Sequence, residues 1–276
     1  MLKTRLIPVL LLKNGILVRS QSFSLHQLMG NHVEQVKRFS TWKADEIIYL
    51  DISRDENYNF LNIQNVIGST SSNSKVVKNS RNNIIDIIKD VSKVCRVPLS
   101  IGGKIHSLDD IKIRLKAGAD KVVINSAALE NPNFIKEASS QFGSQCIVVC
   151  VDVKKNHQTS DWEIYKNFGN AKTNYHLEKW LIQIQDLGAG EILLQSIDKD
   201  GKGGGYDLDL LQKVSKFVDV PLIILGGAGK YEHFIEALDI NNSISLGAAN
   251  IFHFTEQSII KIKKFMFDKN INVRIY

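Results

Sequence analysis

The stretch VPLSIGGKIHSLDDIKIRLKAGADKVVINSAAL, from Val97 to Leu129, contains one complete strand–helix–strand unit. Apolar runs over 97–101 and 120–125 predict two strands, and the segment 107–119 between them predicts a helix. Ser107 is a good N-cap, two aspartates follow it in the first turn, and a glycine follows the helix end. The stretch therefore predicts an α/β protein in which strands and helices alternate.

The same alternation continues along the whole chain. Eight strands, each followed by a helix or a helix-like segment, predict a (β/α)8 TIM barrel, and a doubly wound open sheet is the structural alternative. The expected strands lie near 5–11, 46–51, 97–101, 120–125, 146–152, 191–196, 220–225 and 243–247.

The two halves of the chain repeat each other. VPLSIGG begins at Val97 and VPLIILGG at Val220, and INSAAL at Ile124 and GAANIF at Gly247 keep the same offset of 123 residues. We therefore expect one domain built from two half-barrels.

The half-barrels are expected at about 1–141 and 142–276. The segment 53–80 is long, polar and rich in Asn and Ser, which predicts an inserted loop in the first half.

Composition limits the functions that are open to this chain. The 276 residues carry a net charge of +6 and a pI near 9.0, without a dense basic block, which favours a protein that handles phosphates over one that binds nucleic acid. Three cysteines without zinc-ligand spacing suit a reducing compartment, so we expect a cytoplasmic location and no metal or cofactor. No apolar stretch is long enough for a membrane span, and the apolar run after Arg5 lacks a cleavage site.

The carboxyl ends of barrel strands carry the chemistry of this fold. CIVVCVDVKKN ends in Asp152, two residues before a lysine, whereas RLIPVLLLKNG carries Leu11 at the matching place. Two carboxylates at these positions would make a general acid and a general base on opposite sides of the mouth. This chain has one, so Asp152 is a candidate catalytic residue, with a purely structural carboxylate as the alternative.

Glycine-rich strand ends indicate phosphate binding. SIGGKIHS and LGGAGK place Gly-Gly before a helix, where backbone N–H groups can point at an anion, although a tight strand–helix turn needs glycine as well. Because one such pair occurs in each half, we expect a ligand with a phosphate at each end. The loop SIDKDGKGGGYD adds Asp200 and resembles a segment that covers a ligand, although a solvated turn explains it equally well.

Charged residues begin four of the strands. Side chains alternate between the two faces of a strand, and these four charges fall on the alternate positions that are expected to face the lumen. They can therefore form a ring at the bottom of the barrel, made of Arg5, Glu46, Lys121 and Glu191. Solvated charges at strand starts are the ordinary alternative. If the four side chains are buried, they must pair with each other. A neutral ring of this kind could admit a small uncharged molecule.

The motifs together identify a family resemblance. LLLKNGILVR, IGGKIHS, AGADKVVINSAALENP, FGSQCIVVCVDVK, GAGEILLQSIDKDG, GGAGKYEHFIEA and NIFHF resemble the cyclase subunit of imidazole glycerol phosphate synthase. The resemblance covers nearly the whole chain apart from 53–80. It implies a barrel that docks a glutaminase on its bottom and conducts ammonia through its lumen. At the top, ammonia joins a bis-phosphorylated ribulosyl intermediate to give imidazole glycerol phosphate and a purine precursor.

The resemblance also assigns roles to residues. It makes Asp152 the second catalytic aspartate, with Leu11 in the place of the first, and it places Asp120 at the glutaminase interface. The implied ammonia gate consists of Arg5, Glu46, Lys121 and Glu191. The implied phosphate and ligand contacts are Gly102, Gly103, Asn125, Ser126, Asp200, Gly201, Gly226, Gly227, Ala249 and Asn250.

Three positions depart from the family pattern. Leu11 replaces an aspartate, Asn14 stands where Asp is frequent, and Lys104 stands where a third glycine is usual. These departures favour a branch of the family in which a glutaminase and a cyclase-like barrel supply ammonia to an ATP-dependent protein that amidinates a surface-glycan sugar. The alternatives are a true cyclase of histidine biosynthesis, which is a lyase, and a non-catalytic activator of the glutaminase. None of the three implies a membrane or nucleic-acid partner.

Overall fold

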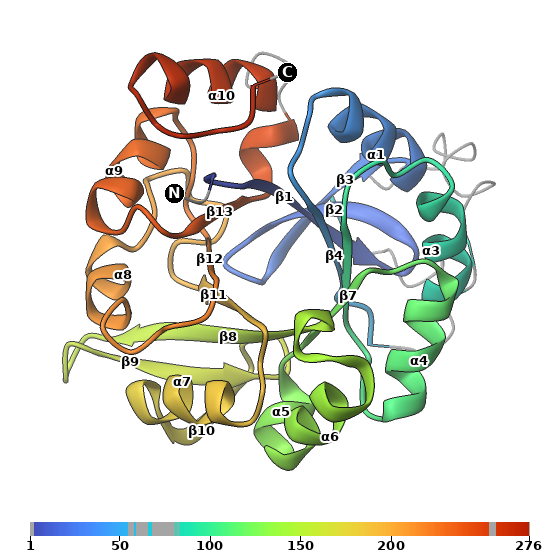
Figure 1. Cartoon of the computed structure of the whole chain (residues 1–276), viewed down its shortest axis with the longest axis vertical. Helices are drawn as coiled ribbons and strands as arrows, with labels where there is room; N and C mark the ends of the chain where they lie inside the picture. The colour runs from blue at the N-terminus through green and yellow to red at the C-terminus, as the bar shows by residue number, and fades with distance from the viewer. Residues whose placement is uncertain are drawn as a thin grey trace.

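The computed structural model describes residues 3–54, 58, 66–67, 81, 83–253 and 258–275. Viewed down the shortest axis, it shows a ring of strands surrounded by helices (Figure 1). Eight parallel strands pair in sequence order, and pairing between the last and the first closes the barrel. These strands are β1 (Leu6–Lys13), β4 (Ile47–Asp51), β6 (Leu99–Gly102), β7 (Lys121–Ile124), β8 (Ile147–Asn156), β11 (Glu191–Ser196), β12 (Leu222–Leu225) and β13 (Ser245–Ala248). The (β/α)8 prediction is confirmed.

Helices cover the outside of this ring. They are α1 (His32–Thr41), α3 (Ile84–Ser92), α4 (Leu108–Ala117), α5 (Ser126–Glu130), α6 (Asn133–Phe142), α7 (Leu177–Asp186), α8 (Leu208–Val214), α9 (Glu232–Ile240) and α10 (Ile259–Asp268). In α4 the expected signals act as predicted: Ser107 and Asp110 form a capping box, and Gly118 ends the helix at a φ of 116°. Among the described helices, none is long and apolar enough to cross a bilayer.

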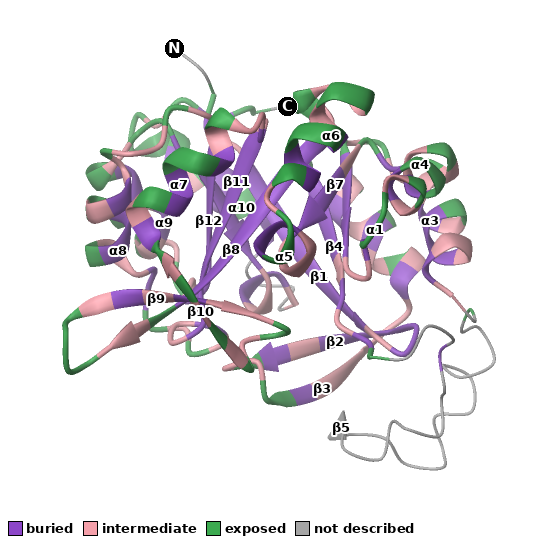
Figure 2. Ribbon diagram, turned by 90° about the horizontal axis from the view of Figure 1, so that it is seen from below, coloured by how far each residue is buried: buried purple, intermediate pink, exposed green. Residues whose placement is uncertain are grey.

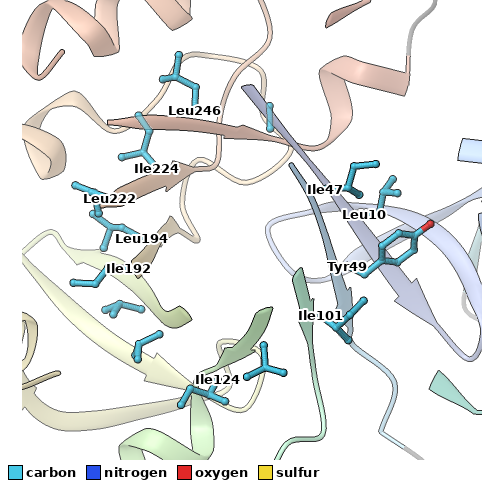
Figure 3. Close-up of a cluster of buried hydrophobic side chains, with 14 of the residues drawn as sticks. Leu10, Ile47, Tyr49, Ile101, Ile124, Ile192, Leu194, Leu222, Ile224 and Leu246 are labelled. Carbon is cyan, nitrogen blue, oxygen red and sulfur yellow. The ribbon is translucent and has the colours of Figure 1, made fainter. Parts of the chain in front are cut away.

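The strands carry two separate apolar layers. One alternate set of side chains, including Leu10, Tyr49 and Ile192 in Figure 3, packs in one cluster with residues of the helices. The other set forms a second cluster inside the ring, which includes Leu11, Val148 and Cys150 together with lumen-facing residues of the other strands. Because side chains alternate along a strand, this division places Asp152 on the lumen side as well.

Two β-hairpins were missed in the sequence. β2 (Ile16–Gln21) and β3 (Leu25–Gly30) follow β1, and β9 (Asp161–Lys166) and β10 (Ala171–His176) follow β8; the short β5 (Val66–Ile67) pairs with β3. Figure 2 shows both hairpins at the same end of the barrel, opposite the termini. This end is where the parallel strands finish, so the hairpins stand beside the mouth.

The turns explain why these hairpins escaped notice. Ser22 and Phe23 have φ values of 50° and 57°, and Asn167 and Phe168 have 54° and 59°. The first loop, residues 22–24, contains neither glycine nor asparagine, which usually signal positive φ angles in a hairpin loop. The second loop, residues 167–170, contains both, so its signal was present and was not used.

Two further expectations need comment. Cys146 does not lie in a strand beside Cys150, as the apolar pattern suggested, because it ends a 3-10 turn, η3 (Ser144–Cys146), before β8 begins. The prediction of an inserted loop over 53–80 falls mostly outside the described residues.

Candidate functional site

The four charged residues predicted at the bottom of the barrel meet in a closed ring. Arg5 Nη1 lies 2.9 Å from Glu46 Oε2, and Arg5 also pairs with Glu191. Lys121 Nζ completes the ring at 2.9 Å from Glu46 Oε2 and 2.8 Å from Glu191 Oε2. We call Arg5, Glu46, Lys121 and Glu191 the charged ring. Each cation contacts both carboxylates, so two positive and two negative charges balance.

The interpretation as solvated charges is wrong for this ring. The side chains of Glu46 and Glu191 are 2% and 6% exposed, and those of Arg5 and Lys121 are 28% and 19% exposed. Burial acts to lower the pKa of Lys121, but the two carboxylates outweigh it and raise that pKa above its ordinary value. The ring is therefore a set of mutually dependent ion pairs, with its two carboxylates almost fully buried.

Two serines hold the ring against the barrel wall. Ser100 in β6 donates from Oγ to Glu46 Oε1 at 2.6 Å, and Arg5 Nε donates to Ser245 Oγ in β13 at 2.9 Å. Both serines are buried. Within the described part of the chain, Lys121 Nζ donates hydrogen bonds to the two carboxylates of the ring and to no serine. Fewer hydrogen bonds therefore fix Lys121 than fix Arg5.

Asp152 lies at the other end of the lumen, in β8. Its Oδ2 accepts a hydrogen bond of 2.7 Å from Asn125 Nδ2, and the Cys150 thiol contacts its Oδ1 at 3.2 Å. Burial raises the pKa of Asp152 to about 7, and the nearby Asp200 adds to this against the two hydrogen bonds. A carboxyl with a pKa near neutrality can both give and accept a proton. The predicted catalytic residue therefore has the environment that such a role requires.

Leu11 lies at the corresponding end of β1, with its side chain in the lumen cluster and 7% exposed. Its backbone pairs with Leu50 of β4 and Val18 of β2. The position is therefore the one from which a carboxylate could reach the mouth, but it carries a hydrocarbon. Among the recorded contacts of Asp152 there is none with a carboxylate of β1, because Leu11 stands at that position.

A cavity of about 380 Å³ opens beside β13 and the β2–β3 hairpin. Two cations, Arg19 and Lys230, line it, together with Asn250 and the backbones of Gly201 and Gly203. We call it the β13 cavity. Among the residues that line it there is no carboxylate. A phosphate fits this lining because it combines positive charge with close approach to backbone.

Gly226, Gly227 and Ala249, the other predicted ligand contacts of the second half, also have structural roles, and their ligand contacts stay a prediction. A Cβ on Gly227 would collide with the carbonyl of Gly205, and one on Gly226 would lie 2.7 Å from the carbonyl of Ser196. Both glycines have positive φ angles, so they are required by the turn itself. Ala249 directly follows β13 and contacts the lumen cluster.

The glycine turn of the first half has a different surrounding. Gly102 ends β6, Gly103 packs on the backbone of Asp51, and Lys104 Nζ lies 3.5 Å from Asp51 Oδ2. Tyr58 donates to the same oxygen at 3.0 Å, and Ser53 donates to Oδ1 at 2.5 Å. We call Asp51, Ser53, Tyr58 and Lys104 the Asp51 cluster. Asp51 is not among the residues predicted from the sequence. It ends β4 with the parity of Ile47 and Tyr49, which pack toward the helices, whereas Asp152 has the lumen-facing parity of β8.

The remaining predicted residues divide by their contacts. Ser126 Oγ accepts from the backbone of Asn167 at 3.1 Å, so it supports the β9–β10 hairpin. Asp200 is buried, and its Oδ2 accepts from Ser20 Oγ at 2.9 Å and from Phe23 N at 3.3 Å. Asp200 therefore fastens the β2–β3 hairpin. The ligand contact expected of it is untested.

Asp120 directly precedes Lys121 and is exposed, while its Oδ2 accepts from the backbone of Leu99 at 2.8 Å. It therefore lies at the bottom of the barrel, beside the charged ring. No group of three His, Cys, Asp or Glu residues that could hold a metal ion occurs in the described part of the chain.

Comparison with known proteins agrees with this arrangement. The family model described as "Histidine biosynthesis protein" matches residues 75–258. A protein of Hydrogenobaculum sp. named imidazole glycerol phosphate synthase subunit HisF is 44% identical over 276 residues, which covers 100% of both chains. Its namesake in Geobacillus kaustophilus is 38% identical over 99% of this chain and 100% of its own, and that in Caulobacter vibrioides is 40% identical over 100% and 97%. This chain belongs to the histidine biosynthesis protein family, among its HisF-like cyclase barrels.

Proposed function

We propose that this protein is the ammonia-receiving subunit of a glutamine-dependent amidotransferase. The observation that carries the proposal is the charged ring, which closes the bottom of a lumen lined by apolar side chains. A neutral molecule loses little on entering such a lumen, whereas an ammonium ion would lose its hydration. The lumen therefore favours ammonia over ammonium.

The proposed partner is a glutaminase docked at the bottom of the barrel. Ammonia has to be produced beside the ring if it is to enter before it becomes protonated in bulk solvent. Asp120 is exposed there and adjoins Lys121, so we propose it as an interface residue. The relatives are named as subunits of a synthase, which supports assembly with a second protein.

The chemistry at the exit has two candidates. The names of the relatives favour the first, formation of imidazole glycerol phosphate from ammonia and a phosphorylated ribulosyl intermediate. In this reaction Asp152, with a pKa of about 7, would be the proton-handling group at the mouth. The β13 cavity would hold a phosphate.

Leu11 supports the second candidate, in which ammonia passes to another acceptor. Leucine can neither take nor give a proton, and loss of one member of an acid–base pair typically costs about 10²–10⁴-fold in rate. The charged ring is nevertheless complete. A barrel with this combination could deliver ammonia to an ATP-dependent protein that amidinates a glycan sugar.

One experiment tests the proposal and separates the candidates. The purified protein is given ammonium salt and the ribulosyl intermediate at pH 8, and then glutamine with a glutaminase in place of the salt. Imidazole glycerol phosphate at an enzyme-like rate supports the first candidate. Glutamine hydrolysis that this barrel stimulates, without that product, supports the second. If the barrel neither binds a glutaminase nor uses ammonia, the proposal is wrong.

A further inference from the structure

The two glycine-rich strand ends, which the sequence presents as equivalent, have different surroundings in the structure. The turn Gly226–Gly227 leads into Ala228, Gly229 and Lys230, which line the β13 cavity, whereas the turn Gly102–Gly103 leads into the Asp51 cluster. This difference bears on what the mouth of the barrel can bind.

Lys104 directly follows the Gly102–Gly103 turn, and its side chain is held by other groups of the protein. Its ammonium lies 3.5 Å from Asp51 Oδ2 and 5.0 Å from the centre of the Tyr58 ring. The Lys104 side chain is 17% exposed and that of Asp51 is fully buried. Because the cation already faces a carboxylate and an aromatic ring, a phosphate would have to separate it from both.

The backbone at Lys104 is fixed as well. Its φ of 52° lies in the left-handed region, which is uncommon for a residue with a side chain. Arg114, which is buried, donates from Nη2 to the carbonyls of Gly103 and Lys104, each at 3.0 Å. A residue kept in a sparsely populated conformation by a buried guanidinium indicates a position that the surrounding structure maintains.

The other polar side chains of this first-half segment are also engaged. Asn125 Nδ2 donates to Asp152, and Ser126 Oγ accepts from Asn167 of the β9–β10 hairpin. Lys104, Asn125 and Ser126 therefore each have at least one contact within the protein, although Asn125 Oδ1 has no hydrogen-bond partner.

The β13 cavity has the opposite character. Arg19 and Lys230 line about 380 Å³ with no carboxylate among the lining residues. Its size falls within the range of small-molecule sites, and the glycine backbones at Gly201, Gly203 and Gly229 permit close approach.

We infer that this barrel binds a ligand by a single phosphate, in the β13 cavity, and that the Asp51 cluster has replaced the phosphate site of the first half. The inference rests on the proposed function in placing the ligand at the ammonia exit, and it names the ligand class as a sugar monophosphate. The sequence predicted a ligand with two phosphates, one at each end, and the inference replaces it with a ligand that has one phosphate.

Calorimetry with two probes, ribose 5-phosphate and ribulose 1,5-bisphosphate, tests the inference without ammonia or a partner. The wild-type protein should bind the two with dissociation constants within about threefold of each other. Lys104→Gln should leave both dissociation constants within about twofold of the wild-type values, whereas Lys230→Ala should raise both dissociation constants by about tenfold or more. Thermal unfolding of each variant checks that the fold is intact.

Three results would overturn the inference. One is a preference of about tenfold or more for the bisphosphate that disappears in Lys104→Gln, since Lys104 would then bind the second phosphate. The others are an unchanged affinity in Lys230→Ala, and no binding of ribose 5-phosphate at about 10 mM. None of these would affect the charged ring, so failure here is distinguishable from failure of the proposed ammonia transfer.

Discussion

Asn125 and Asp152 are joined by a hydrogen bond of 2.7 Å between Asn125 Nδ2 and Asp152 Oδ2, at the ends of the neighbouring strands β7 and β8. Asn125 Oδ1 is buried and has no hydrogen-bond partner, so the amide is fixed chiefly by this one contact. With the Cys150 thiol on the other oxygen, the carboxyl has both of its oxygens occupied by protein groups. Its protonation is therefore coupled to the folded structure.

Asp152 should make the stability of the protein depend on pH. Burial raises its folded-state pKa to about 7, above the ordinary value of 3.8. Between these two values the unfolded chain binds fewer protons, so wild-type stability should fall as pH rises, by up to about 1.4 kcal/mol per pH unit from this group. Asp152→Asn removes the effect. Urea unfolding at pH 5, 6, 7 and 8 should show the variant gaining stability relative to the wild type, and a constant difference would contradict the shifted pKa.

Introducing a carboxylate at position 11 should supply the second acid–base group if the protein binds the ribulosyl intermediate. Leu11→Asp should raise the rate of imidazole glycerol phosphate formation from free ammonia by about 10²–10⁴-fold. Because the side chain is only 7% exposed, the charge should also cost stability, on the order of 1–3 kcal/mol. Leu11→Asn is the matched control, since it has nearly the same shape and no acid. Equal rates in wild type and Leu11→Asp would show that Leu11 does not limit this reaction.

Asp200 should determine how firmly the β2–β3 hairpin is held. Asp200→Ala removes the acceptor for Ser20 Oγ and Phe23 N, which should lower the local opening free energy by about 1–3 kcal/mol. Hydrogen exchange of amides 18–28 should then accelerate by about tenfold or more. Asp209→Ala is the control, because that carboxylate is 75% exposed. Unchanged exchange in Asp200→Ala would mean that the hairpin is held by its other contacts.

The sequence was sufficient for the barrel and for the lumen-side parity of the four ring residues, but it left solvated charges open as the alternative to a paired ring. Apolar runs with helices between them predicted the eight strands, because a strand buried on both faces needs a continuous apolar segment. Parity within strands placed Arg5, Glu46, Lys121 and Glu191 on the lumen side, and buried charges of both signs can only pair.

The sequence was insufficient where the outcome depended on distant side chains. The repeated Gly-Gly motifs looked equivalent, because the sequence does not show that Lys104, which follows β6, contacts Asp51 at the end of the neighbouring strand β4 and the ring of Tyr58. The hairpin loop at Ser22 carries a weak local signal, and a tertiary contact between Asp200 and Phe23 supports it. Local pattern therefore predicted the scaffold better than the mouth.

The central claim is that the charged ring governs the passage of ammonia. The most direct measurement uses a complex with a glutaminase, glutamine labelled with ¹⁵N in its amide, excess unlabelled ammonium, and the acceptor found active above. In the wild type, product nitrogen should come mainly from glutamine. Lys121→Ala leaves Glu46 and Glu191 with Arg5 alone, which should cost about 3–5 kcal/mol of stability. It should also lower the fraction of product nitrogen that carries the ¹⁵N label.

Lys112→Ala, an exposed position on α4, is the control and should behave as the wild type. The account predicts that a smaller fraction of the product nitrogen carries the ¹⁵N label in Lys121→Ala than in the wild type, while the variant stays folded. An unchanged labelled fraction in a folded Lys121→Ala variant would contradict it.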